Sequence, residues 1–176
     1  RAAKQDAAVL TDPASIAWLL NIRGGDVPFT PFALGFAIVH ADGATELFID
    51  PVKLSADTRA WLGNTVSFAS RTALGSALDR LGGKTVRVDA AGSPVWFAQR
   101  LGAAGATVVA DPDPCLLPKA CKNAVEQKGA REAHERDAIA VCRFLHWLHQ
   151  HGPTGRETEM SAAETLLSFR QQLQGF

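Results

Sequence analysis

A cation and an anion stand three residues apart in a segment rich in glycine and proline. Arg23 and Asp26 lie within the run Asn21-Ile-Arg-Gly-Gly-Asp-Val-Pro-Phe-Thr-Pro31. Glycine adopts backbone angles that other residues avoid, whereas proline fixes its own, so we expect a stiff, sharply turned loop. The arginine fork suits recognition of carboxylates and carbonyl groups, which makes Arg23 and Asp26 candidate substrate-binding residues. The alternative is an Arg23–Asp26 ion pair that only braces the turn.

A second set of residues has the types and spacing of a soft metal site. Cys142, His146 and His149 are separated by four and three residues, so they share one face of a helix. Phe144 and Trp147 interleave with them, however, and no acidic residue or C-x-x-C pair completes the set. A short histidine-bearing tract is only a compositional hint. We therefore assign no metal ligand to this chain.

Other catalytic signatures are missing from the sequence. There is no G-x-S-x-G turn, no phosphate-binding loop and no dinucleotide fingerprint, and the carboxylates are scattered. We therefore name no catalytic residue. Cys115 and Cys121 complete an odd, sparse set of three cysteines, which predicts reduced thiols, small apolar side chains that pack, and a cytoplasmic protein.

The composition is that of a globular protein. Of 176 residues, 47% are hydrophobic, which is enough for a core, and the 18 basic residues balance the 18 acidic ones. A balanced charge provides no general attraction to nucleic acid or to anionic lipid. No apolar run approaches the roughly 20 residues that span a bilayer, and the N-terminus lacks the apolar stretch of a signal peptide. We expect neither nucleic acid nor a membrane as a partner.

Hydrophobic periodicity and the positions of glycine, proline and capping residues predict the elements that must position Arg23 and Asp26. Asp12-Pro13 predicts a helix cap and first turn, and Asp42-Gly43 between two β-prone runs predicts a hairpin. Gly82-Gly83 and Gly102 are expected to end helices. The predicted strands are 6–11, 33–40, 44–50, 64–69, 85–89 and 106–110, and the predicted helices are 13–20, 52–61, 72–81, 93–101, 124–149 and 158–172.

Alternation of strands and helices predicts a three-layer α/β domain with a mixed sheet of six strands, followed by two C-terminal helices. We expect the domain to cover residues 1–112. The proline-rich stretch within 113–122 is the best candidate for a linker. Residues 123–176 would then supply the two helices.

Two long motifs carry a family resemblance. The run SIAWLLNIRGGDVP from Ser15 and the run KNAVEQKGAREAHERDAIAVCRFLHWL from Lys122 resemble the Xaa-Pro aminopeptidases (aminopeptidase P) of the creatinase/prolidase superfamily. The resemblance covers nearly the whole chain. It implies the second creatinase-like N-terminal domain, and helices that lead into a pita-bread catalytic domain missing from this chain.

The resemblance also implies a function. The parent enzyme would remove an N-terminal residue that precedes proline, using two divalent metal ions, commonly manganese, held by its pita-bread domain. This chain would be noncatalytic, without a cofactor, and would shape the peptide cleft and support assembly. Its implied partners are proline-containing peptides, its own catalytic domain and a second copy in a homodimer. Phe29 departs from the histidine that relatives often place there.

Two other functions stay open on the sequence alone. The chain could be a stand-alone creatinase-like binding or interaction module without peptidase activity. It could also be a small α/β enzyme in its own right, although the sequence offers no convincing constellation of polar residues for one. We expect the isolated chain to release no amino acid from an Xaa-Pro peptide.

Overall fold

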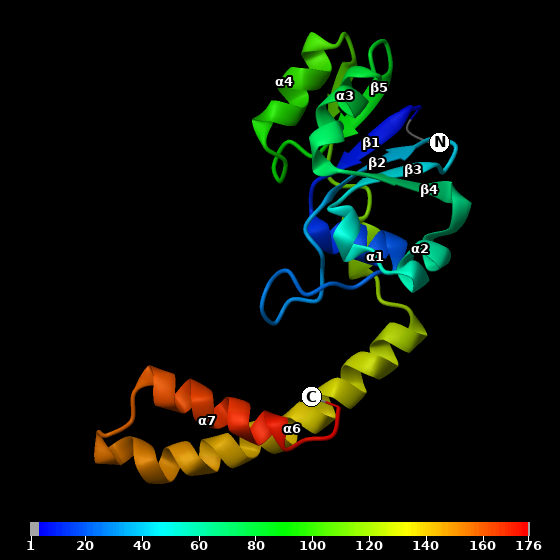
Figure 1. Ribbon diagram of the computed structural model, residues 1–176. Coiled ribbons are helices and arrows are strands. Elements are labelled where there is room, and N and C mark those ends of the chain that lie inside the picture. Colours follow the sequence, from blue (N-terminus) through cyan, green and yellow to red (C-terminus); the bar gives the residue numbers. More distant parts are fainter. Residues whose placement is uncertain (1–3, 176) are drawn as a thin grey trace. The chain divides into compact units, whose positions relative to one another are not determined.

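The computed structural model describes residues 4–175, which divide into two compact units, residues 4–121 and 122–175 (Figure 1). The first unit is built on one six-stranded sheet in the order β4-β3-β2-β1-β5-β6. β2 is antiparallel to β1 and β3, and the other neighbours are parallel. The predicted α/β fold with a mixed sheet is thus confirmed. The strands are β1 Ala7–Leu10, β2 Phe36–His40, β3 Thr45–Phe48, β4 Val66–Ala69, β5 Thr85–Val88 and β6 Thr107–Ala110.

Helices cover both faces of the sheet, as a three-layer domain requires. One core packs α3 and α4 against residues such as Val9 and Val86, and the other packs α1 and α2 against residues such as Leu10 and Leu47. Neighbouring residues Val9 and Leu10 belong to different cores because side chains alternate along a strand. The helices of this unit are α1 Pro13–Leu20, α2 Ala56–Leu62, α3 Leu74–Asp79, α4 Val95–Ala103 and α5 Leu116–Ala120.

Two elements lie where short-range sequence patterns predict them. Asp12 caps α1, and its carboxylate accepts hydrogen bonds from the backbone N–H groups of Ala14 and Ser15. The hairpin between β2 and β3 turns at Gly43, whose φ of +99° is a conformation that glycine adopts at little cost. Both features depend on residues a few positions apart, so the sequence was sufficient to predict them.

The end of α4 differs from the expectation. Gly102 lies inside the helix, which continues to Ala103, and Gly105 takes the left-handed conformation at φ +83°. The backbone N–H of Ala106 closes this end by donating to the carbonyl of Leu101, which is completely buried. Burial of Leu101 keeps the last turn helical, and the reversal falls where the chain must enter β6.

The segment expected to be a linker belongs to the first unit up to residue 121. Cys115 is buried in the core that includes α1, and α5 follows it directly. The boundary between the two units therefore lies at residues 121–122, at the end of the expected 113–122 segment rather than at its start.

The second unit is a helical hairpin. It contains α6 Ala124–His151 and α7 Glu159–Gln171, which correspond to the two predicted C-terminal helices. Asn123 starts α6 with a capping box, in which the Asn123 side chain accepts a hydrogen bond from the backbone N–H of Glu126 and the Glu126 carboxylate accepts one from the backbone N–H of Asn123. The Arg170 guanidinium binds the Asp137 carboxylate at 2.7 and 2.9 Å, which ties α7 to α6. Over residues 4–175, no helix combines the length and apolarity needed to cross a membrane.

Candidate functional site

The loop that carries Arg23 and Asp26 follows the C-terminal end of α1. Asn21 ends the helix in the left-handed conformation at φ +49°, which turns the chain into the loop. The Arg23 guanidinium donates to the carbonyls of Ile22 at 2.9 Å and Ala17 at 3.3 Å. A cation is favourable here because the carbonyl groups at a helix C-terminus carry partial negative charge. Arg23 is exposed beside this helix end.

The Asp26 carboxylate makes a different set of contacts. Its carboxylate accepts a hydrogen bond of 2.7 Å from the backbone N–H of Leu34 and pairs with the Lys53 ammonium at 2.5 Å. Lys53 belongs to the one-turn helix Pro51–Lys53 that follows β3, so the ion pair joins two loops. The hydrogen bond from Lys53, and then that from Leu34, lower the pKa of Asp26 below 3.8.

The structure does not form the Arg23–Asp26 ion pair that we consider as the alternative. Asp26 pairs with Lys53, and Arg23 binds backbone carbonyls instead. The two candidate residues therefore have separate local tasks. Asp26 braces the loop, whereas Arg23 is the charged group that the braced loop presents.

Gly24 allows the loop to fold closely on itself. Its N–H donates to the Pro31 carbonyl at 3.4 Å, and a Cβ atom at this position would lie 2.7 Å from both the backbone nitrogen and the Cβ of Ala33. At the tip of the loop, Phe29 has a φ of +61° and an exposed fraction of 91%. The loop thus displays an aromatic ring at a strained backbone position.

A pocket of about 290 Å³ lies beside Arg23. Aromatic rings and a proline dominate its walls, and Arg23 supplies the charged group. The pocket belongs wholly to α1 and the loop; its lining is Ala14, Ala17, Trp18, Arg23, Thr30, Pro31 and Phe32. Such a combination of apolar walls with one directional donor is typical of small ligand sites.

The bracing role of Asp26 predicts a pH dependence. Its pKa is lowered in the folded chain, so the ionised form stabilises the loop above pH 3.8 and this contribution is lost as pH falls through the folded pKa. We expect a carboxyl-carbon NMR titration to give a midpoint below 3.8 for Asp26, and a higher midpoint in Lys53→Met. Equal midpoints in the parent and Lys53→Met would contradict the assignment.

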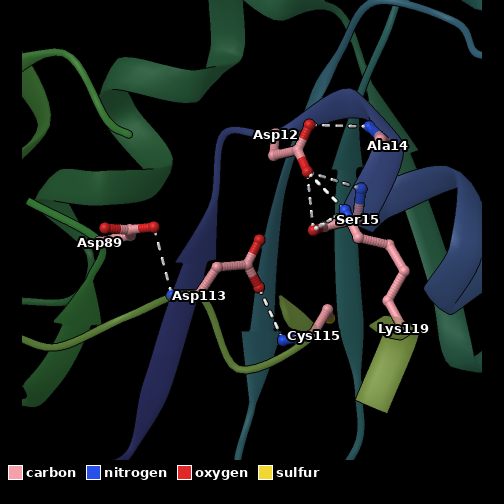
Figure 2. Close-up of polar contacts among 7 residues, drawn as sticks. All are labelled: Asp12, Ala14, Ser15, Asp89, Asp113, Cys115 and Lys119. Atoms are coloured by element: carbon pink, nitrogen blue, oxygen red, sulfur yellow. Dashed lines mark hydrogen bonds and ion pairs between the residues drawn. The ribbon is translucent and has the colours of Figure 1, made fainter. Parts of the chain in front are cut away.

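Sequence reasoning missed a polar cluster at the start of α1 (Figure 2). The Lys119 ammonium lies 2.8 Å from the Asp12 carboxylate and donates to the Ser15 hydroxyl at 3.1 Å. The Ser15 hydroxyl in turn donates to Asp12 at 2.9 Å. Lys119 is separated from Asp12 by 107 residues, so no local pattern could have revealed this cluster.

The cysteine and histidine residues do not gather into a metal site. Cys142, His146 and His149 are exposed on α6, and the described part of the chain, residues 4–175, contains no group of three potential ligands able to hold a metal ion. Cys115 is buried, and burial raises the pKa of its thiol to about 12, with Asp113 adding to the shift. A thiol with this pKa is a poor nucleophile.

Comparisons with known proteins place the chain in a family. The profile described as "Creatinase/Prolidase N-terminal domain" matches residues 1–126. Xaa-Pro aminopeptidase 1 of Dictyostelium discoideum is 32% identical over 97% of this chain and 28% of its own length. Human Xaa-Pro aminopeptidase 2 is 28% identical over 93% of this chain and 25% of its own length. The chain thus spans roughly a quarter of the length of these curated relatives.

Solved structures agree with the sequence relatives. The X-prolyl aminopeptidase of Caenorhabditis elegans, described as a cytosolic enzyme with a di-nuclear active site, superposes with a TM-score of 0.83 at 28% identity. The match covers 97% of this chain and 29% of that enzyme. A Xaa-Pro dipeptidase from Bacillus anthracis has a TM-score of 0.71 at 13% identity, covering 97% of this chain and 45% of the dipeptidase, and shares the fold. With its sheet, loop and helices as described, the chain belongs to the creatinase/prolidase N-terminal domain family.

Proposed function

We propose that this chain is a noncatalytic part of a metal-dependent Xaa-Pro aminopeptidase of the cytoplasm. The enzyme would remove the N-terminal residue that precedes proline, and the chain would shape the peptide cleft and support assembly with the catalytic domain or a second copy. Relatives over 97% and 93% of the chain are named Xaa-Pro aminopeptidases. The nematode enzyme of similar structure is described as cytosolic.

The observation that carries the proposal is the loop from Asn21 to Leu34. Asp26 and Lys53 brace it, Gly24 lets it fold closely, and Arg23 lines a pocket of about 290 Å³ with Trp18. A guanidinium beside apolar walls can donate to a peptide carbonyl or carboxylate while the walls pack against an apolar ring. We assign this recognition to Arg23, with Asp26 as the residue that positions the loop.

Metal binding is assigned to another part of the enzyme. The described residues contain no group of three His, Cys, Asp or Glu side chains that could hold an ion, which supports this assignment. The di-nuclear active site is a property of the nematode enzyme. We propose two divalent ions, manganese, for the parent, and no step of our proposal passes through an ion bound by this chain.

The experiment compares Arg23→Ala, Arg23→Lys and the unaltered sequence within the longer enzyme, with an Xaa-Pro peptide and manganese. Loss of a hydrogen bond from a charged donor costs about 1.5–3 kcal/mol, which corresponds to a fall in kcat/KM of roughly 10- to 100-fold. Arg23→Lys should recover part of it, because lysine keeps the charge but not the fork. Arg131→Ala on α6, an exposed arginine, should leave kcat/KM unchanged.

The isolated chain provides the second part of the experiment. We expect it to release no amino acid from the same peptide with manganese. Unchanged kcat/KM in Arg23→Ala would contradict the assignment of peptide recognition to Arg23. Metal-dependent release of an amino acid by the isolated chain would overturn the noncatalytic assignment.

A further inference from the structure

Residues 114–121, which we call the clasp, are attached to the rest of the first unit mainly through polar contacts. Within the clasp, Cys115 is buried, whereas Leu116 and Leu117 of α5 have exposed fractions of 54% and 72%. A single small buried side chain provides little apolar stabilisation. The attachment of the clasp therefore depends strongly on its hydrogen bonds and on its ion pair.

The strongest of these contacts join Lys119 to the start of α1. The ammonium group donates to Ser15, which is completely buried, and pairs with the Asp12 carboxylate at 2.8 Å. Figure 2 shows Lys119 reaching toward Asp12 and Ser15 from α5. Hydrogen bonds to charged groups are stronger than neutral ones, so this cluster holds the C-terminal half of the clasp.

The residues that precede the clasp are held separately, by β5 and the turn that follows it. Arg87 donates to the Pro112 carbonyl at 2.7 Å and pairs with Asp111 at 3.1 Å. The Asp89 carboxylate accepts a hydrogen bond of 3.3 Å from the backbone N–H of Asp113. These contacts lie on the far side of Cys115 from Lys119, so residues 111–113 can stay attached to β5 when residues 114–121 release.

The space beneath the clasp is incompletely filled. A pocket of about 380 Å³ that is open to solvent lies between the clasp, α1 and the sheet, and its walls include Trp18, Leu19, Cys115 and Pro118. Unfilled space removes contacts that would otherwise hold the segment down. The clasp is thus a region of low local stability within a unit whose sheet is well packed.

We propose that the clasp opens as a unit while the sheet stays folded, and that the Asp12–Ser15–Lys119 cluster is the catch that keeps it closed. When it is closed, the connection between the two units consists of Lys122 and Asn123, since Asn123 already caps α6. Opening adds residues 114–121 to that connection. About ten extended residues span up to roughly 35 Å, so the catch controls the length of the tether.

The test uses Cys115 as a reporter of opening. In a Cys121→Ser, Cys142→Ser background, Cys115 is the remaining thiol, and its modification by a disulfide reagent requires exposure. Asp12→Asn keeps a helix-capping side chain but removes the charge, and Lys119→Met removes the ammonium group. We expect both variants to increase the labelling rate at least tenfold, whereas Lys84→Met, at an exposed site, should leave it unchanged.

Hydrogen exchange of β1 and β5 is measured on the same proteins. Faster labelling of Cys115 without faster exchange in these strands supports a clasp that opens by itself. Unchanged labelling in both catch variants overturns the proposal. An equal rise in Cys115 labelling and in strand exchange also overturns it. Labelling of Cys115 in the background protein only at the global unfolding rate does the same. In both cases the clasp and the sheet open together.

Discussion

The Phe97→Ala variant is expected to lose about 3–5 kcal/mol of the free energy of unfolding, enough to unfold much of the first unit at 37 °C. Phe97 lies on α4 with an exposed fraction of 2%, and its ring packs against Phe36 at 5.3 Å and Trp96 at 5.1 Å between centroids. Removing the ring forfeits its apolar burial and leaves a cavity that the surrounding helices and sheet can fill only in part. Urea unfolding followed by circular dichroism measures the change.

Phe29→Ala is the matched control for this prediction. It removes the same side chain from a site where 91% of it is exposed, so the free energy of unfolding should change by less than about 0.5 kcal/mol. Equal losses in the two variants would contradict the core that we describe between α4 and the sheet.

The Gly24→Ala variant is expected to disturb the candidate site while leaving the sheet intact. The new methyl group would lie 2.7 Å from backbone and Cβ atoms of Ala33, so the loop must shift, at a cost of about 1–3 kcal/mol. Displacement of the loop also moves Arg23 relative to the walls of its pocket. In the longer enzyme we therefore expect a fall in kcat/KM comparable to that of Arg23→Ala.

Gly25→Ala separates sterics from the general effect of removing a glycine. Apart from Gly24 and Asp26, which adjoin it in the chain, no residue has an atom within 4 Å of a Cβ at this position, so the variant should keep both stability and activity. The comparison is made by urea unfolding together with backbone NMR shifts of residues 22–34. If Gly24→Ala and Gly25→Ala behave alike, the close approach to Ala33 does not determine the loop conformation.

Much of the fold could be predicted because its signals are local. The cap at Asp12 and the hairpin at Gly43 each involve residues at most a few positions apart. The alternation of strands and helices then led to the six-stranded mixed sheet. Local geometry restricts the backbone strongly enough that residue types and spacing are sufficient.

Predictions that depended on tertiary packing were less accurate. Gly102 looked like the end of α4, yet the helix continues and Gly105 makes the reversal, since burial of Leu101 stabilises the last turn. The proline-rich segment looked like a linker, yet Cys115 is buried in the core of the first unit. Tertiary packing overrode the local signal in both places.

The sequence by itself determined the family, the α/β architecture and the loop that presents Arg23. Tertiary structure alone decided which partner each charge takes. Asp26 pairs with Lys53, 27 residues away, instead of Arg23 three residues away, and Asp12 pairs with Lys119 across 107 residues. The physical reason is that an ion pair needs its two groups within about 4 Å, and for distant residues that proximity is created by the packing of the sheet and helices.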